Sequence, residues 1–151
     1  MRAILFDKNP AANWSLGWHQ DRTVAVRQRR DVAGFGPWTV KSGLLHVAPP
    51  VSVLEAMVTL RIHLDPVPPT NAPLLIALGT HRIGLVAEAA TDPTAAAAEV
   101  VACLAERGDI WLYRTLVLHA SAASDAPRRR LVLQIDYAAD ALPGGMEFLG
   151  I

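Results

Sequence analysis

The stretch NWSLGWHQDRTVAV, residues 13–26, places two tryptophans, a histidine and an aspartate directly before an alternating apolar strand. Residues two apart in a strand point to the same face, so His19 and Asp21 can reach one ion together if they lie at a strand end. Polar and aromatic side chains at this density, directly before a strand, are not needed to form the core of a sheet protein. The stretch therefore predicts either a metal site or a polar turn that leads into a strand.

Composition narrows the class of protein. A chain of 151 residues has the size of one domain, so we expect a single domain over residues 1–151. The 14 basic and 14 acidic side chains cancel, which argues against a nucleic-acid or membrane-surface partner. The single cysteine, Cys103, excludes an intramolecular disulfide and is expected to pack in the core. No apolar run reaches the roughly 20 residues of a membrane span, so we expect a cytoplasmic protein.

Short apolar runs, some of them alternating with polar residues, predict a series of strands at residues 3–6, 23–26, 57–65, 74–78, 110–113, 115–120 and 131–137. Residues 34–50 are rich in glycine and proline and predict a long loop with one extended piece at 38–41. A short helix is expected from residue 51. A longer helix is expected to begin at Asp92, followed by Pro93, and to end at Gly108. This pattern favours an all-β antiparallel barrel or jelly roll with an inserted helix.

A third metal ligand must come from elsewhere in the chain, and His119 is the best candidate. It ends the apolar run TLVLH, and Ser121 follows on the same side of the strand. Two histidines and a carboxylate leave metal positions open, as in non-haem Fe(II) oxygenases. Such enzymes bind a keto-acid cosubstrate, and Arg130, expected beside His119 across a hairpin, has the planar fork that binds a carboxylate. A capping or core role remains the alternative for any single histidine.

Other readings of these residues are weaker. His63 and Asp65 have the same spacing on a strand, but only four expected strands follow them, too few to close a barrel. A catalytic zinc at His19, Asp21 and His119 would leave the arginine without a role. A serine hydrolase needs a glycine elbow, which the sequence HASAAS lacks.

Several segments together, in order, resemble the bacterial branch of the phytanoyl-CoA dioxygenase family. They are RAILFDKNPAANWSLGWHQDRTVAV, GFGPWTVKSG, PPVSVLEAMVTLRIHLD, NAPLLIALGTHRIG, WLYRTLVLHASAAS and RRRLVLQIDYA. The resemblance implies a double-stranded β-helix, a cupin-like jelly-roll barrel. It also implies an Fe(II)- and 2-oxoglutarate-dependent dioxygenase that uses O₂ to hydroxylate a small-molecule substrate, with release of succinate and CO₂.

Position by position, the resemblance makes His19, Asp21 and His119 the iron ligands. It makes Arg130 the anchor of 2-oxoglutarate, with Arg128 as the alternative, and Ser121 a second contact to the same carboxylate.

Four further side chains have less specific expectations. Trp38 lies near the place where family members put a tryptophan against the cosubstrate, with loop packing as an equal alternative. Trp14 and Trp18 are expected as pocket wall or flanking core. Lys8 could line the pocket mouth, although a solvated turn lysine fits its setting better.

The chain also departs from the family. Relatives carry a substantial segment before the equivalent of Arg2, including elements that brace the barrel. We therefore expect a minimal natural version, a fragment, or one half of a homodimer that completes the barrel. The alternative function is a non-catalytic metal-binding or scaffolding jelly roll that kept the triad.

Overall fold

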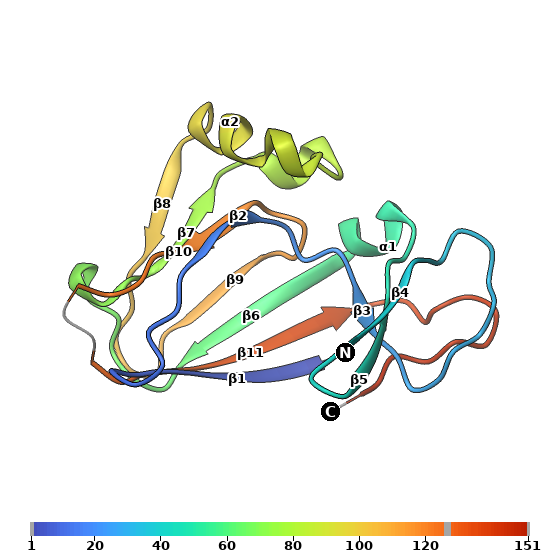
Figure 1. Ribbon diagram of the computed structural model, residues 1–151, viewed down its shortest axis with the longest axis horizontal. Coiled ribbons are helices and arrows are strands. Elements are labelled where there is room, and N and C mark those ends of the chain that lie inside the picture. The colour runs from blue at the N-terminus through green and yellow to red at the C-terminus, as the bar shows by residue number, and fades with distance from the viewer. Residues whose placement is uncertain (1, 126–127, 151) are drawn as a thin grey trace.

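Strands from all parts of the chain form two four-stranded antiparallel sheets that face each other in the computed structural model, which describes residues 2–125 and 128–150 (Figure 1). The first sheet has the order β1 (Arg2–Lys8), β11 (Arg130–Ala138), β6 (Met57–His63) and β9 (Ile110–Arg114). The second has the order β2 (Leu16–His19), β10 (His119–Ser121), β7 (Leu74–Ala77) and β8 (Val100–Cys103). A small third sheet has the order β3 (Val24–Ala25), β5 (Leu44–Val47) and β4 (Trp38–Lys41). The all-β jelly roll expected from the sequence is confirmed.

Alternation along the strands of the first sheet decides which side chains face the second sheet. In β6 every second residue is buried, and β11 follows the same period from Arg130 to Asp136. Several of these buried positions are polar or charged, which is unusual for a face that packs toward a core. The interior between the sheets is therefore apolar toward the second sheet and polar toward the first. Cys103, 1% exposed, packs there with Leu74 and Ile76, as expected.

The helices are short and lie outside the two main sheets. They are α1 (Val51–Glu55), α2 (Thr91–Ala96) and the 3₁₀ turns η1 (Pro69–Asn71), η2 (Thr80–Ile83) and η3 (Glu88–Ala90). Ala95 of α2 packs against Ala77 of β7 and Trp18 of β2, so this helix covers the outer side of the second sheet (Figure 1). Within residues 2–125 and 128–150, no helix combines the length and apolar character that a bilayer crossing requires.

The long helix expected from Asp92 to Gly108 is wrong. The helix ends at Ala96, and residues 100–103 form strand β8, which pairs with β7 from Val100 to Cys103. The alanine run favours a helix locally, but the β-branched Val100 and Val101 fit a pleated surface, and pairing with a neighbouring strand outweighs local propensity.

The strand expected at residues 115–120 is also wrong in most of its length. The chain leaves β9 of the first sheet at Arg114 and enters β10 of the second at His119. Leu116, Val117 and Leu118 are buried because the chain crosses the core between the sheets there. As a result β10 and β11 belong to different sheets, and the hairpin expected to join His119 to Arg130 does not form.

The expected loop at residues 34–50 contains a hairpin instead of one extended piece. Strands β4 and β5 pair from Trp38 with Val47 to Lys41 with Leu44. Ser42 and Gly43 join them with φ angles of 50° and 78°. Two positive φ angles define the tight turn that matches the twist of paired strands.

Candidate active site

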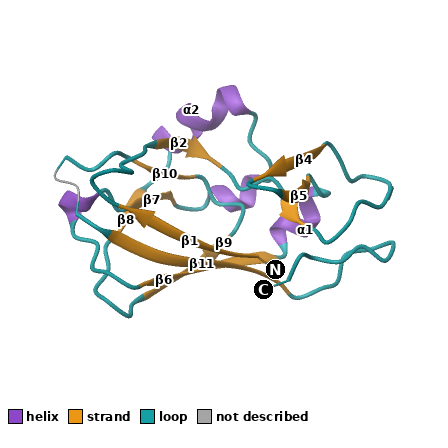
Figure 2. Cartoon of the chain, turned by 60° about the horizontal axis from the view of Figure 1, so that its bottom comes forward, coloured by secondary structure: helices purple, strands orange, loops and turns teal. Residues whose placement is uncertain are grey.

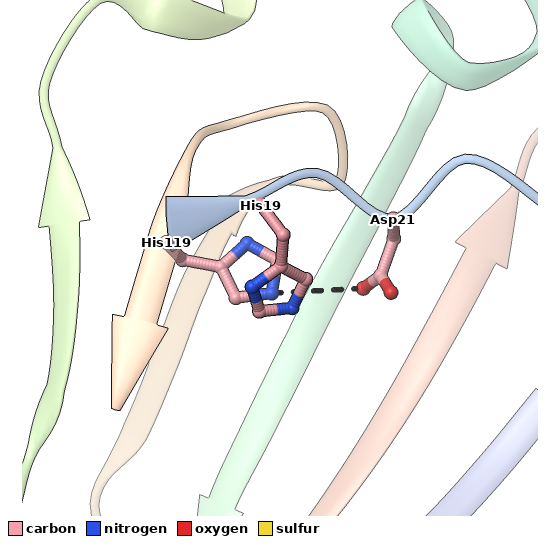
Figure 3. Close-up of side chains that lie close together, drawn as sticks. All are labelled: His19, Asp21 and His119. Atoms are coloured by element: carbon pink, nitrogen blue, oxygen red, sulfur yellow. Dashed lines mark ion pairs between the residues drawn. The ribbon is translucent and has the colours of Figure 1, made fainter. Parts of the chain in front are cut away.

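The structure brings His19, Asp21 and His119 together at one end of the second sheet (Figure 3). His19 ends β2, His119 begins β10, and the two are directly paired in the antiparallel register. Asp21 follows two residues after His19 and turns to the same side. One potential ligand atom from each side chain lies within 4.8 Å of the others, and the His119 Nε2 to Asp21 Oδ2 distance is 4.0 Å.

Hydrogen bonds to the backbone fix the tautomer of both histidines. Nδ1 of His19 lies 2.8 Å from the Gly17 carbonyl oxygen, and Nδ1 of His119 lies 3.0 Å from that of Val117. A carbonyl oxygen only accepts, so each Nδ1 carries the hydrogen and each Nε2 keeps a lone pair. Burial lowers the pKa of His119, which keeps this ring neutral. Both rings therefore hold the form that ligates a metal through Nε2.

Gln20, which lies between His19 and Asp21 just after the end of β2, anchors this part of the chain through hydrogen bonds. Its side chain is buried and points away from the triad. Its Nε2 donates to the carbonyl oxygens of Gly84 (2.9 Å) and Leu116 (2.8 Å), and its Oε1 accepts from the Val86 N–H (2.9 Å). The sequence analysis missed this role, although alternation alone puts Gln20 on the face opposite its neighbours.

A cavity of about 290 Å³ opens beside the triad, between the two sheets. This volume is at the low end of the roughly 300–1,000 Å³ of small-molecule sites. Apolar and polar side chains share its wall: Arg2, Ile4, Phe6, Trp14, Leu16, His19, Asp21, Lys41, Arg61, Leu74, His119, Ser121, Arg130 and Gln134. The cavity thus connects the triad with Arg130 and Ser121, which the sequence grouped with it.

Arg130 faces the triad from the first sheet and is 3% exposed. One Nη1 hydrogen bond goes to the Ala72 carbonyl oxygen, and Ser121 Oγ donates to the same oxygen at 3.3 Å. Burial, and secondarily the nearby Arg61, lower the pKa of Arg130 to about 10, so it remains a cation at neutral pH.

The two neighbouring arginines do not enter the cavity. Arg129 forms an exposed ion pair with Asp7 at 3.1 Å, and Arg128 is exposed. Of the three consecutive arginines, only Arg130 can reach a ligand beside the triad.

Lys8 corrects a second expectation, because it is not a solvated turn residue. It ends β1 opposite Arg130, is 1% exposed, and donates from Nζ to the Ala122 carbonyl oxygen. Its Nζ also lies 5.4 Å from the centre of the Trp14 ring. Burial, with a contribution from Arg130, lowers the pKa of Lys8 to about 8. Two buried cations therefore stand side by side at this end of the first sheet.

Of the three tryptophans considered in the sequence analysis, one lines the cavity and two pack in apolar clusters elsewhere. Trp14 lines the cavity, while Trp18 packs against the Ala95 side of the second sheet. Trp38 packs against the apolar cluster around the third sheet, with the Arg29 guanidinium 5.4 Å from its ring. Trp38 is not one of the described residues that line the cavity. Its position therefore fits loop packing and not contact with a cosubstrate.

The rival pair at the end of β6 is not part of a ligand group. The Asp65 carboxylate accepts hydrogen bonds from the Leu131 N–H (3.1 Å) and Arg107 (3.2 Å). His63 is buried, and neither Asp65 nor His63 joins a three-residue ligand group in the part of the chain that the structure describes.

Arg61 is a cavity residue that the sequence analysis missed. It lies on β6, is 6% exposed, and donates from Nη1 to Gln134 Oε1 at 2.7 Å. Its guanidinium lies 5.2 Å from the centre of the Phe6 ring. The alternation in MVTLRIHLD puts Arg61 on the polar face of its strand, which sequence reasoning assigns to solvent, so no local signal identifies it as a cavity residue.

The residues present fit an iron and keto-acid site. Two histidines that present Nε2 and one carboxylate leave coordination positions open, which is the ligand set of non-haem iron oxygenases. Nε of Arg130 is buried without a hydrogen-bond partner in the described residues, so it retains a donor for an anion. Buried polar groups are normally paired, and an unpaired one in a cavity indicates a ligand.

Comparisons with known proteins agree with this geometry. A sequence model described as "Phytanoyl-CoA dioxygenase (PhyH)" matches residues 1–130. The structure of AviO1 from Streptomyces viridochromogenes Tue57 is similar with a TM-score of 0.61 and 22% identity, over 93% of this chain and 51% of that one. EctD from S. alaskensis with bound Fe gives a TM-score of 0.62 and 18% identity, over 91% and 43%.

A third similar structure is the "non-heme monooxygenase, ThoJ-Ni complex", with a TM-score of 0.57 and 19% identity over 90% of this chain and 42% of that one. The chain thus spans about half of these structures or less. No curated protein matches it. At these identities the structural likeness establishes a shared fold.

Proposed function

The chain belongs to the phytanoyl-CoA dioxygenase family, and on that premise we propose that it is an Fe(II)- and 2-oxoglutarate-dependent dioxygenase that hydroxylates a small molecule. The observation that carries the proposal is the shared cavity. A triad of two metal-ready histidines and a carboxylate opens onto the same small space as a buried arginine with an unpaired donor. EctD, which shares the fold, contains Fe in its crystal structure.

In this proposal His19, Asp21 and His119 hold the iron. Arg130 binds the carboxylate of 2-oxoglutarate that lies far from the metal, with Nε as its free donor. Ser121 Oγ donates to the Ala72 carbonyl oxygen, and its hydroxyl turns to the same carboxylate when the cosubstrate binds. An arginine fork binds a carboxylate through two parallel hydrogen bonds, which also fixes its orientation.

Bound iron and 2-oxoglutarate would supply the oxidising power for hydroxylation by O₂, with one oxygen atom in the product hydroxyl, the other in succinate, and CO₂ as the second product. The chain itself contributes a wall of Ile4, Phe6, Trp14, Leu16 and Leu74 around the triad. Leu74 is buried and Ile4 and Phe6 are half-buried, whereas Trp14 and Leu16 are exposed, so the wall is apolar but open to solvent on the side of Trp14 and Leu16.

The test is succinate release from 2-oxoglutarate by the purified protein with Fe(II), ascorbate and O₂. We expect slow uncoupled turnover without substrate. Asp21→Ala should abolish turnover and lower Fe(II) affinity by at least about 100-fold, because it removes a ligand. Arg114→Gln is the matched control, since Arg114 is exposed on β9.

Two outcomes separate the proposal from a non-catalytic jelly roll. Succinate release that depends on Asp21 supports the dioxygenase. Tight Fe(II) binding without 2-oxoglutarate binding or succinate release contradicts it and leaves a metal-binding protein.

A further inference from the structure

Unpaired polar atoms in the interior gather on one face of the first sheet. Among the described residues, the buried side-chain atoms without a hydrogen-bond partner belong to Arg61, His63, Tyr113 and Arg130. These residues lie on β6, β9 and β11, and the cavity wall includes both arginines. Buried polar groups in native proteins are almost always paired, so the pattern indicates more than one missing partner. 2-Oxoglutarate accounts for Arg130, and of the three residues that remain only Arg61 lines the cavity.

The charges around the cavity also do not balance. Lys8, Arg61 and Arg130 are all buried, and no carboxylate lies within ion-pair distance of any of them in the described part of the chain. With a divalent metal they carry five positive charges. Asp21 and a 2-oxoglutarate dianion supply three negative charges. Burying unpaired cations is costly, so the excess favours a further anion in this space.

Arg61 is separate from the position at Arg130. It pairs in register with Gln134, four residues along β11 from Arg130, which is about 13 Å along a strand. Its Nη1 is held by Gln134, and its Nε is buried without a partner among the described residues, so Nε keeps a donor for an anion. Beside it stands Phe6, from the apolar part of the wall.

We propose that Arg61 binds a carboxylate of the primary substrate, so that the substrate is a small organic carboxylate with an apolar body. The inference rests on the proposed function, because only an enzyme has a substrate. It assigns Arg61 as the residue that selects a negatively charged substrate. The apolar wall next to Arg61 accepts the body, and Gln134 holds the guanidinium in place.

Hexanoate and hexanamide are suitable probes, because they share an apolar body and differ in charge. Each is titrated into the full chain loaded with Mn(II) and 2-oxoglutarate, and binding is followed by calorimetry and by the thermal unfolding midpoint. We expect hexanoate, and not hexanamide, to bind and to raise the midpoint. Arg61→Met should weaken hexanoate binding by at least about tenfold while 2-oxoglutarate affinity changes by less than about threefold.

Two variants keep the result interpretable. Arg61→Lys retains the charge and should keep part of the hexanoate response, even if Arg61→Met folds poorly. Arg114→Met, on the exposed face of neighbouring β9, should behave as the unmodified protein. A purely structural role of Arg61 would lower stability in both Arg61 variants without a difference between the two probes.

The inference is overturned if hexanoate binds no better than hexanamide, if Arg61→Met retains the hexanoate response, or if Arg61→Met weakens 2-oxoglutarate binding as much as Arg130→Met. Failure of the proposed function has a different signature. In that case 2-oxoglutarate does not bind the unmodified protein, while the dependence of hexanoate binding on Arg61 can still be measured.

Discussion

Arg130 is buried beside two exposed arginines, and this contrast gives a sharp prediction at the residue scale. Arg130→Met should weaken 2-oxoglutarate binding by about 2–4 kcal/mol, the value of a charged, two-hydrogen-bond contact, and leave Mn(II) affinity nearly unchanged. Arg129→Met is the matched control, because the Arg129 side chain forms an exposed ion pair with Asp7 and does not line the cavity. Calorimetry with the Mn(II)-loaded protein measures both. Equal 2-oxoglutarate affinity in the two variants would remove Arg130 from the site.

His63 gives a prediction about pH. Burial, with the nearby cations Arg61 and Arg130, lowers the pKa of His63 to about 4, against an ordinary value of 6.5. Between about pH 4 and pH 6.5, the His63 side chain is therefore protonated in the unfolded chain and neutral in the folded chain. The contribution of His63 to the free energy of unfolding is therefore largest above about pH 6.5, and it decreases as the pH drops toward 4.

His63→Leu should remove this loss, which amounts to up to about 2 kcal/mol near pH 5. The thermal unfolding midpoint should fall less between about pH 7.5 and pH 5 in the variant than in the unmodified protein. Parallel midpoint curves would show that His63 does not carry the effect.

Single residues were predictable where their spacing or their place on a strand limits the geometry. The grouping of His19, Asp21 and His119 follows from period two and from the end of an apolar run, and their role as iron ligands stays a prediction. The burial of Arg61 and Lys8 was not predicted, because a charged residue in a strand is ordinarily exposed to solvent. Only the surrounding sheet shows that these two point inward.

At the scale of elements, the β4–β5 hairpin depends on its turn. Gly43 has a φ angle of 78° and no neighbour that a Cβ would meet within 4 Å. Gly43→Ala should therefore lower the free energy of unfolding by about 1 kcal/mol through backbone strain alone. Gly17→Ala is the control, since Gly17 is also in open space without a positive φ angle. Urea unfolding compares them, and equal midpoints would contradict the assignment of the turn.

Elements were predictable where one face of a strand is buried and the other is not. Strand β6 shows this alternation in the sequence, while β1 and β11 contain short apolar runs, and all three lie close to where the sequence predicts them. The predictions for residues 92–108 and 115–118 were wrong for a different reason. The first contains a strand that exists because β7 offers it a pairing edge, and the second is apolar because it crosses the core between the sheets. Neither tertiary environment is visible in local sequence.

At the scale of the whole molecule, no helix covers the outer face of the first sheet (Figure 2). Apolar side chains are exposed on this face. Leu5, Leu133, Ile62 and Ile110 form one row across the four strands, and Ala3, Ile135, Leu60 and Leu112 form the next. Leu5, Ile110 and Leu112 are 57%, 56% and 63% exposed. Contiguous exposed apolar patches on proteins commonly mark interfaces.

The homodimer expected from the sequence remains a prediction, and this face is where we expect it. Light scattering during size exclusion should report a dimer, and Leu112→Lys should shift it toward monomer. Leu85→Lys is the control, because Leu85 is exposed and lies outside this sheet. A monomer at all concentrations, or a dimer insensitive to Leu112, would contradict the prediction.

The central claim is that one cavity holds the metal and the keto acid together, and a crystal structure with Mn(II) and 2-oxoglutarate under anaerobic conditions tests it most directly. The account predicts Mn(II) bound by His19 Nε2, His119 Nε2 and the Asp21 carboxylate. It also predicts one carboxylate of 2-oxoglutarate on Arg130 and Ser121. Metal bound to other residues, or 2-oxoglutarate that leaves Arg130 without an anion, would contradict it.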